Sequence, residues 1–350
     1  MEKTMAKKRM TKKERMRQRR RRQRMMFGGG LLLVAVVFTV ILLLLGSKGC
    51  GTSKAEGDEV EAVPSAEATE APTAEPTPTP EPVPSVDISD INSRSGILVR
   101  LSDGKVVAEK DADAKIYPAS MTKIMTAVVG LENLSDQNET ITIDRDTYDR
   151  LYTEGASLAG FGAGDEVKAI DILYGVMLPS GAECCIALAD TIAGSEADFV
   201  TLMNEKAAKL GMTGTNFCDT TGLHDANHYS TARDIAVLLK YALKDDTFRE
   251  IIESPYHSTP GTNIHPDGIT FYSTMFKNLS DTAVTDGKIM GGKTGYTGEA
   301  GHCLASFAEI DGTEYILVTG GASGTGIPHI NDAVTVYNRL GAAAQALNEG

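Results

Sequence analysis

The spacing of apolar residues from about Ile88 onward predicts a folded domain that mixes strands with helices. Residues 96–110, GILVRLSDGKVVAEK, alternate around an Asp-Gly turn, which is typical of two antiparallel strands. In residues 117–132 the apolar side chains recur every three or four positions, which predicts an amphipathic helix with Pro118 in its first turn. The apolar positions of that helix are Met121, Ile124, Met125 and Val128.

Turn and capping residues divide the following stretch into further helices. Residues 169–194 predict two helices that are broken at Pro179-Ser180-Gly181. Two patterns resembling capping boxes begin the next two helices, which we expect to run through Leu210 and Leu243. The capping pairs are Ser195 with Asp198 and Thr231 with Asp234.

The last part of the chain predicts a second hairpin at 302–321 and a helix from about Asn331. Strands therefore occur at both ends of the domain, with helices between them. This order indicates an α/β domain whose sheet unites distant parts of the chain. We find no internal repeats.

An uncharged run of 22 residues occupies positions 25–46, long enough for a membrane span of about 20 residues. Residues 1–24 carry a net charge of +11, although the whole chain carries −13. Such a tail could bind nucleic acid, but its position favours the cytoplasmic side of a membrane. We expect a single-pass transmembrane anchor, with the rest of the chain extracytoplasmic. The alternatives are a cleaved signal peptide and, less well supported by the sequence, a lipid on Cys50.

Residues 47–87 have the composition of a disordered linker. Seven of the thirteen prolines lie between Ala55 and Asp87, mixed with Glu, Ala, Thr and Ser. Such a segment buries too little apolar surface to fold, and its prolines favour an extended stalk. At about 3 Å per residue, it could hold the domain at 88–350 as far as about 100 Å from a membrane.

The stretch GKIMGGKTGYTG, residues 287–298, fits two motifs. Its first eight residues match a phosphate-binding P-loop, whereas Lys293-Thr294-Gly295 matches the K-T-G element of penicillin-interacting serine enzymes. A P-loop must follow a buried strand and open a helix. The residues before the motif do not predict a buried strand, and no helix is predicted after it. We therefore expect no nucleotide site here.

Ser120-Met121-Thr122-Lys123 supplies the Ser-x-x-Lys element that usually accompanies K-T-G. Residues at this spacing share one face of a helix, so the lysine amine can reach the serine hydroxyl. Serine is a weak nucleophile and needs an adjacent base. Burial or a second cation such as Lys293 would lower the pKa of Lys123 and free its amine to act as that base.

Together with these two elements, several longer stretches resemble the serine D-alanyl-D-alanine carboxypeptidases, the low-molecular-mass penicillin-binding proteins. The resemblance covers most of residues 88–345. It implies a β-lactamase or penicillin-binding-protein-like α/β fold, with a central antiparallel sheet flanked by helices and a helical subdomain. The stretches are 118–127, 172–183, 199–217, 220–234 and 291–306.

The resemblance also implies a role for each motif residue. Ser120 is the acyl-accepting nucleophile, Lys123 takes its proton, and Ser180 relays a proton to the leaving D-alanine. The backbone amides of Ser120 and Tyr296 form the oxyanion hole. The substrate-binding residues are Lys293 and Thr294, which bind the terminal carboxylate, with Gly295 and Tyr296 along the strand. The substrate is the peptidoglycan stem pentapeptide, and β-lactams act as inhibitors.

Two departures from the family pattern bear on function. Ala182 replaces the usual Asn of the middle element and loses an amide that would bind the substrate backbone and the catalytic lysine, a hydrogen bond worth about 1.5–3 kcal/mol. About 55 residues follow Gly295, too few for both the β-rich domain and the C-terminal anchor of many relatives, so we expect the N-terminal span to replace that anchor. The alternatives are a catalytically weak penicillin-binding or wall-binding protein and a serine β-lactamase.

The remaining cysteines and histidines suggest no cofactor. Five cysteines leave at least one unpaired, and Cys184-Cys185 resembles two buried helix residues more than a vicinal disulfide. Cys218 and Cys303 could pair, although the sequence does not show whether they are close. His224 and His228 have a spacing that could bind zinc on a helix, but they lie in a predicted loop, so we expect no metal site.

Overall fold

The computed structural model describes residues 83–349. The basic tail at 1–24, the proposed span at 25–46 and most of the proposed linker at 47–87 lie outside the described residues. Among the residues that are described, no helix has both the length and the apolar character needed to cross a membrane.

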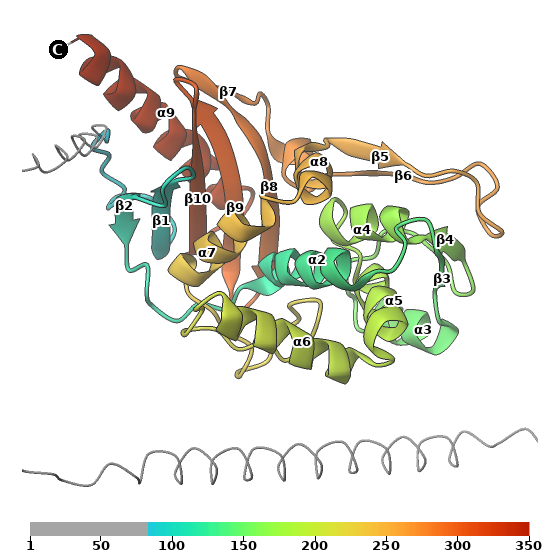
Figure 1. The fold of residues 1–350 in the computed structure, drawn as a ribbon. Helices are drawn as coiled ribbons and strands as arrows, with labels where there is room; N and C mark the ends of the chain where they lie inside the picture. Colours follow the sequence, from blue (N-terminus) through green and yellow to red (C-terminus); the bar gives the residue numbers. More distant parts are fainter. Residues whose placement is uncertain (1–82, 350) are drawn as a thin grey trace, which may run out of the picture. The chain divides into compact units, whose positions relative to one another are not determined.

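A six-stranded antiparallel sheet organises the domain, as the resemblance implied (Figure 1). The strand order is β2-β1-β10-β9-β8-β7. Strands from the two ends of the domain meet at its centre, where β1 pairs with β10. The strands are β1 (Ser95–Arg100), β2 (Val106–Lys110), β7 (Ala283–Val284), β8 (Gly287–Thr297), β9 (Gly301–Ile310) and β10 (Thr313–Ala322).

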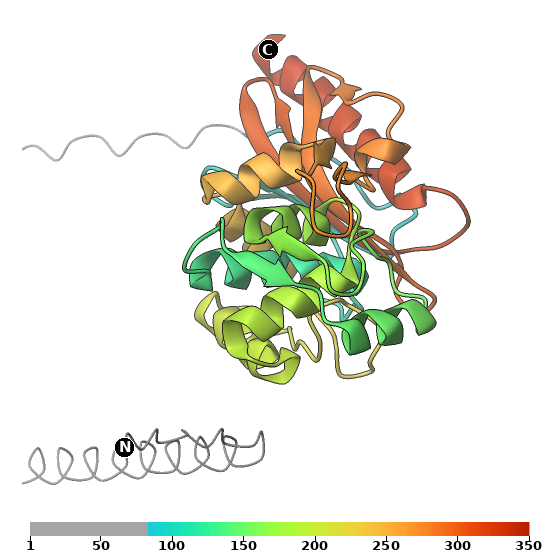
Figure 2. The ribbon, with the colours of Figure 1, turned by 90° about the vertical axis from the view of Figure 1, so that its right-hand side faces the viewer.

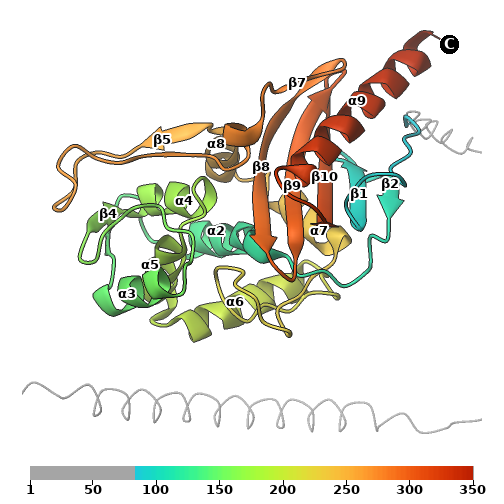
Figure 3. The same ribbon diagram turned by 180° about the vertical axis from the view of Figure 1, so that it is seen from behind.

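The described helices lie on both faces of this sheet and beyond its edge. Helix α9 covers one face, whereas α2, α7 and α8 lie at the other (Figure 3). Helices α3 to α6 lie beyond α2 and form the helical part of the domain (Figure 2). The helices are α2 (Thr122–Asn133), α3 (Arg145–Thr153), α4 (Ala169–Met177), α5 (Ala182–Ala193), α6 (Glu196–Lys209), α7 (Ala232–Ala242), α8 (Asp246–Glu253) and α9 (Pro328–Glu349).

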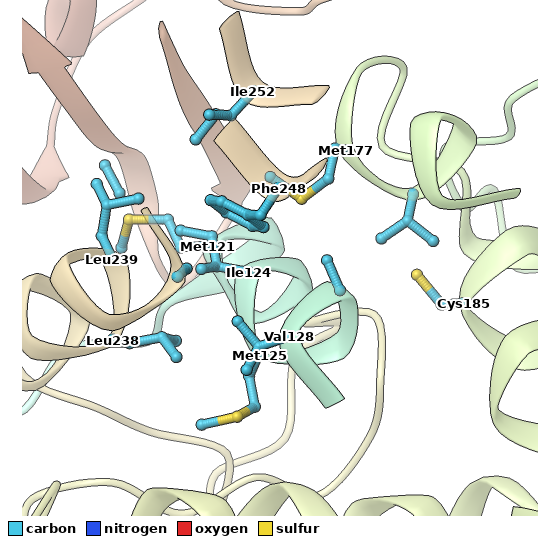
Figure 4. Packing of buried hydrophobic residues seen from close by; sticks show 14 of the residues in the cluster. Met121, Ile124, Met125, Val128, Met177, Cys185, Leu238, Leu239, Phe248 and Ile252 are labelled. Carbon is cyan, nitrogen blue, oxygen red and sulfur yellow. The ribbon is translucent and has the colours of Figure 1, made fainter. Parts of the chain in front are cut away.

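Successive side chains along each strand point to opposite faces of the sheet, which produces two separate apolar cores. Val318 and its alternating neighbours on β10 face α2 and α7, whereas Leu317 faces α9. Helix α2 is buried along nine consecutive residues because other helices surround it on the side away from the sheet. Figure 4 shows its apolar residues packed against α7 and α8, with Met177 and Cys185 nearby.

The predicted helices and hairpins are confirmed, with small shifts at their ends. Helix 117–132 begins with a 3₁₀ turn, Ala119–Met121, before α2. The side chains of Ser195 and Thr231 accept N–H bonds at the starts of α6 and α7, as the capping pattern predicted. Helix α9 begins at Pro328, three residues before the predicted Asn331, because proline fits the first turn of a helix.

Two short sheets were not predicted from the sequence. Strands β3 (Thr140–Thr142) and β4 (Glu166–Lys168) pair beside α4, and β5 (Tyr256–Ser258) pairs with β6 (Thr270–Tyr272) in a long projecting hairpin (Figure 1). Each strand has three residues, too few to establish an alternating pattern.

A buried carboxylate on α9 holds the start of the domain. Asp332 Oδ1 accepts the Asn92 N–H at 2.9 Å, and its Oδ2 accepts from the Ser93 N–H and hydroxyl at 2.8 and 2.6 Å. These bonds join segments about 240 residues apart in sequence. They fix the chain just before β1 against α9 and so help to position β1 in the sheet.

Replacing Asp332 with Ala should lower the free energy of unfolding by about 2–3 kcal/mol, because buried N–H donors lose their acceptor. Urea denaturation of the full-length chain would measure the change. Thr335→Ala on the exposed side of the same helix is the matched control and should change stability by less than about 0.5 kcal/mol. Equal effects of the two substitutions would contradict a structural role for the Asp332 carboxylate.

Candidate active site

The predicted motifs meet at one cavity of about 360 Å³ beside the C-terminal end of β8. The start of α2, the loop between α4 and α5, and β8 each contribute to its wall. Five of the seven residues predicted from the sequence line it, namely Ser120, Ser180, Thr294, Gly295 and Tyr296. The two predicted lysines lie below this wall, since Lys123 and Lys293 are only 2% and 0% exposed.

Ser120 lies in a tight turn that depends on two glycines. Ala119 has a φ of +47°, a left-handed conformation that costs free energy for a residue with a Cβ. A Cβ on Gly222 would clash with the Ala119 carbonyl, and a Cβ on Gly295 would lie 3.0 Å from the Ser120 nitrogen. Glycine at both positions lets the backbone of two distant segments close around the serine.

Lys123 contacts Ser120 directly, as the Ser-x-x-Lys spacing predicted. Its Nζ donates to Ser120 Oγ at 3.1 Å and to the Thr221 carbonyl at 2.7 Å. Burial lowers the pKa of Lys123 below its ordinary value of 10.5 because the charged amine loses its hydration, although acidic neighbours oppose the shift. A neutral amine at this distance can accept the serine proton.

Asp219 organises the loop that receives Lys123. Its Oδ1 accepts the N–H groups of Thr221 and Gly222 at 2.7 and 2.6 Å. Burial alone would raise its pKa, but bonds from His228 and these amides lower it to about 2. His228 also bonds to the Thr122 hydroxyl at 2.8 Å, so the loop is tied to the start of α2. Sequence reasoning missed these supporting roles.

Lys293 supplies a second amine below the cavity. Its Nζ donates to the Thr294 carbonyl at 3.0 Å. Burial lowers the pKa of Lys293 well below its ordinary value, and the nearby Lys123 lowers it further. A bound anion would reverse this shift, since an opposite charge favours the protonated amine.

Ser180 presents a free hydroxyl at the opposite wall. Its Oγ is buried and has no hydrogen-bond partner among residues 83–349, and its φ is +70°. The residue lies between α4 and α5, where the sequence predicted a break. An unpartnered buried hydroxyl costs free energy, and a bound molecule that forms a hydrogen bond with Ser180 Oγ would remove that cost.

Ala182, which replaces the usual Asn, does not line the cavity. Its side chain is 1% exposed and lies in a small apolar cluster with Leu151 and Ile186. Its backbone N–H donates to the Ser157 carbonyl at 2.8 Å. Ser157 lines the cavity, so the backbone of Ala182 holds part of the wall.

Glu183 holds the same wall from below. Its Oε1 accepts the N–H groups of Ala159 and Gly160 at 2.7 and 3.1 Å, whereas its Oε2 is buried without a partner among the described residues. Burial raises the pKa of Glu183 despite these bonds. The carboxyl group therefore fixes the loop that carries Ser157.

The segment after β6 contributes residues that the sequence did not identify. Thr274 and Asn278 line the cavity, and the Thr274 and Thr294 hydroxyls bond to each other at 2.6 Å. The Thr274 N–H donates to the Leu178 carbonyl at 3.0 Å, which ties this segment to the loop before Ser180. The contacts join parts of the chain too far apart for periodicity to reveal.

An aromatic group forms the remaining wall. The Tyr296 ring lies 4.5 Å from that of His302, which stacks on His329 at 5.0 Å. Burial, followed by the proximity of His302, lowers the pKa of His329 to about 4, so this ring is neutral at pH 7. Its Nδ1 is buried without a partner among the described residues.

The other candidate groups do not join the cavity. GKIMGGKT lies within β8 and is followed by a turn and β9, so the helix that a P-loop requires is not present after it. The His224 ring packs against Tyr117, whereas the His228 ring bonds to the Thr122 hydroxyl. Within residues 83–349, no group of three or more His, Cys, Asp or Glu side chains could hold a metal ion. Cys184, Cys185 and Cys303 are buried free thiols, and Cys218 is free and exposed.

Comparison with known proteins assigns this arrangement to a family. The family model described as D-alanyl-D-alanine carboxypeptidase matches residues 80–324. Among curated relatives, the D-alanyl-D-alanine carboxypeptidases DacF of Bacillus subtilis and DacC of Escherichia coli are 32% and 40% identical over 234 and 167 residues. These alignments cover 66% and 46% of this chain, and 58% and 42% of the relatives. The chain thus spans about half the length of the curated relatives it matches.

Solved structures give the same result for the fold. The Streptomyces K15 DD-transpeptidase is similar with a TM-score of 0.64 and 26% identity, over 73% of this chain and 98% of that one. A D-alanyl-D-alanine carboxypeptidase from Mycobacterium tuberculosis H37Rv gives 0.63 and 27%, over 77% and 97%. The chain therefore belongs to the D-alanyl-D-alanine carboxypeptidase family, peptidase family S11.

Proposed function

We propose that this protein is a serine-type D-Ala-D-Ala carboxypeptidase that removes the terminal D-alanine from peptidoglycan stem pentapeptides. The observation that carries the proposal is the 3.1 Å hydrogen bond from Lys123 Nζ to Ser120 Oγ beside a substrate-sized cavity. Buried lysine next to serine is a base and nucleophile arrangement suited to acyl transfer. Membership of the family supports the same reaction.

In the proposed reaction, Ser120 Oγ attacks the carbonyl carbon of the penultimate D-alanine while neutral Lys123 takes the hydroxyl proton. The amides of Ser120 and Tyr296 stabilise the resulting oxyanion. The peptide bond then breaks, and Ser180 relays the proton to the amine of the leaving D-alanine. Water hydrolyses the ester and restores the Ser120 hydroxyl. A β-lactam acylates the same serine and is released slowly.

In this proposal, the terminal carboxylate of the substrate lies beside Lys293 and Thr294 on β8. The Thr294 hydroxyl, held by Thr274, can donate to it, while the Lys293 charge acts from below. No strand among residues 83–349 pairs with the outer edge of β8 beyond Lys288, so a peptide can lie along that edge. Gly295 leaves room for this approach.

A catalytically weak protein that binds β-lactams or wall peptides is the second candidate. Its motivation is Ala182, whose methyl group provides no amide for the substrate. A β-lactam would acylate Ser120 in both candidates, and the second candidate would differ by releasing little or no D-alanine from a stem peptide.

We also propose that residues 25–46 anchor the protein in the cytoplasmic membrane, with the catalytic domain outside. The support is the uncharged run of 22 residues after a tail of net charge +11. This location would place the domain at the peptidoglycan, where its substrate occurs.

Ser120→Ala should abolish the release of D-alanine from a peptide ending in Lys-D-Ala-D-Ala, with a loss of at least about 10⁴-fold, because no nucleophile remains. Labelled penicillin should also fail to bind covalently. Ser135→Ala, an exposed serine outside the cavity, is the control. Penicillin trapping by the native chain without D-alanine release would favour the weak-binding candidate, and release by Ser120→Ala would refute the mechanism.

The rate of Ser120 acylation should fall as the pH decreases through the lowered pKa of Lys123, since protonation removes the base. This acid limb should lie below pH 10.5, the ordinary lysine value. Penicillin acylation rates measured across pH would locate it. Lys123→Arg, whose side chain stays protonated, should lose about 10²–10⁴-fold at every pH. A native profile that rises only above pH 10.5 would contradict the role of burial.

The protein recovered from bacterial membranes should retain residues 1–24. Mass spectrometry of the N-terminus, combined with alkaline carbonate extraction, would measure this retention and the strength of the membrane attachment. Recovery of a soluble chain that starts after residue 46 would show a cleaved signal peptide, and a lipid-modified Cys50 at the N-terminus would show lipidation.

A further inference from the structure

A second cavity of about 390 Å³ adjoins the first at Tyr296 and His302, which line both. Arg94 and Glu299 line only the second cavity. None of the motif roles assigned above uses either charge. The groove beside β8 therefore continues beyond the catalytic residues into a region with one cation and one anion.

The fold brings these two charges to the same end of the sheet. Arg94 precedes β1, and Glu299 lies in the turn between β8 and β9. Arg94 Nε donates to the Gly321 carbonyl at 3.2 Å, and a Cβ on Gly321 would lie only 2.6 Å from that nitrogen. The bonds from Asp332 hold the two residues before Arg94. The guanidinium is thus positioned by the fold.

Neither charge is neutralised within residues 83–349. Arg94 and Glu299 are both exposed and form no ion pair there. Most other arginines in that range do hold a carboxylate, namely Arg100, Arg150, Arg233, Arg249 and Arg339. Two unpaired opposite charges in one cavity suit a ligand that carries both an ammonium and a carboxylate.

The direction of the bound peptide places such a ligand in this cavity. With the terminal carboxylate near Lys293, the peptide runs antiparallel to β8, and its earlier residues lie toward Gly298. An extended chain advances about 3.3 Å per residue, so the residue before the acylated D-alanine lies about one strand position beyond Tyr296. Gly298 lines the second cavity, so that residue's side chain enters it.

We propose that this cavity selects the third residue of the stem peptide, counted from the D-Ala-D-Ala terminus, by a side chain ending in both an ammonium and a carboxylate. The Glu299 carboxylate accepts hydrogen bonds from the ammonium, and the Arg94 guanidinium donates two hydrogen bonds to the carboxylate. The inference rests on the proposed function for the direction of the peptide. It makes a diamino dicarboxylic acid the preferred residue over lysine, which lacks the carboxylate.

Binding to the full-length Ser120→Ala chain in detergent micelles tests the inference without turnover. The probes are three acetylated peptides X-D-Ala-D-Ala in which X is meso-2,6-diaminopimelate, L-lysine or uncharged L-norleucine. Isothermal titration calorimetry should rank their affinities in that order. Each added charge on the peptide should raise its affinity about three- to fivefold, the range of a single exposed ion pair. The preference should weaken with added salt.

Two substitutions in the same background separate the two contacts. Arg94→Gln should remove the preference for diaminopimelate over lysine and leave the preference for lysine over norleucine. Glu299→Gln should remove the preference for lysine over norleucine. The matched controls are Glu309→Gln, at the opposite end of the same hairpin, and Arg145→Gln on α3, which should leave all three affinities unchanged.

Measuring D-alanine release by the native chain from the same peptides distinguishes the two proposals. Selective binding without Ser120-dependent release would overturn the carboxypeptidase function and support the cavity's selectivity. Release of D-alanine with affinities equal within twofold would overturn the selectivity and leave the function intact. Preferences that survive both cavity substitutions would also overturn the assignment to Arg94 and Glu299.

Discussion

The hydrogen bond between Lys123 and Ser120 is the contact around which the domain is arranged. A lysine is costly to bury as a cation, so its position next to the serine requires an environment that accepts an amine without hydrating it. Helix α2 provides this environment because it is buried along nine consecutive residues. The Thr221 carbonyl provides a partner, and Asp219 holds the loop that carries it. The geometry of this proposed catalytic pair depends on the packing of the helices against the sheet.

The second buried lysine makes this arrangement sensitive to charge. Burial lowers the pKa of Lys293, which shares a poorly hydrated region with Lys123. Two cations in one such region disfavour each other, which keeps at least one amine ready to act as a base. A substrate carboxylate near Thr294 would favour the protonated form of Lys293 while the serine-bound amine stays neutral. In the proposed reaction, the electrostatics of this one site would link substrate binding to the activation of the base.

Local signals in the sequence predicted much of the fold and the catalytic motifs. Apolar spacing and capping residues identified α2 and α4 to α7, because these features depend on neighbours within a few positions. The Ser-x-x-Lys pair was predictable for the same reason. Thr274, Glu183 and Asp332 were not, because each acts on a partner at least twenty residues away and belongs to no periodic pattern. The complete burial of Lys293 could not be predicted from the sequence either, because burial depends on how the whole core is assembled.

Ala182 shows why a missing side chain and a missing function are different matters. The motif pattern counts it as the loss of an amide, and its methyl group indeed lies in an apolar cluster away from the cavity. Its backbone N–H nevertheless holds Ser157, and the neighbouring Glu183 holds Ala159 and Gly160. Any residue except proline at position 182 has the backbone N–H that bonds to the Ser157 carbonyl, so this part of the cavity wall does not require asparagine. The backbone bond that holds Ser157 therefore remains with alanine at position 182.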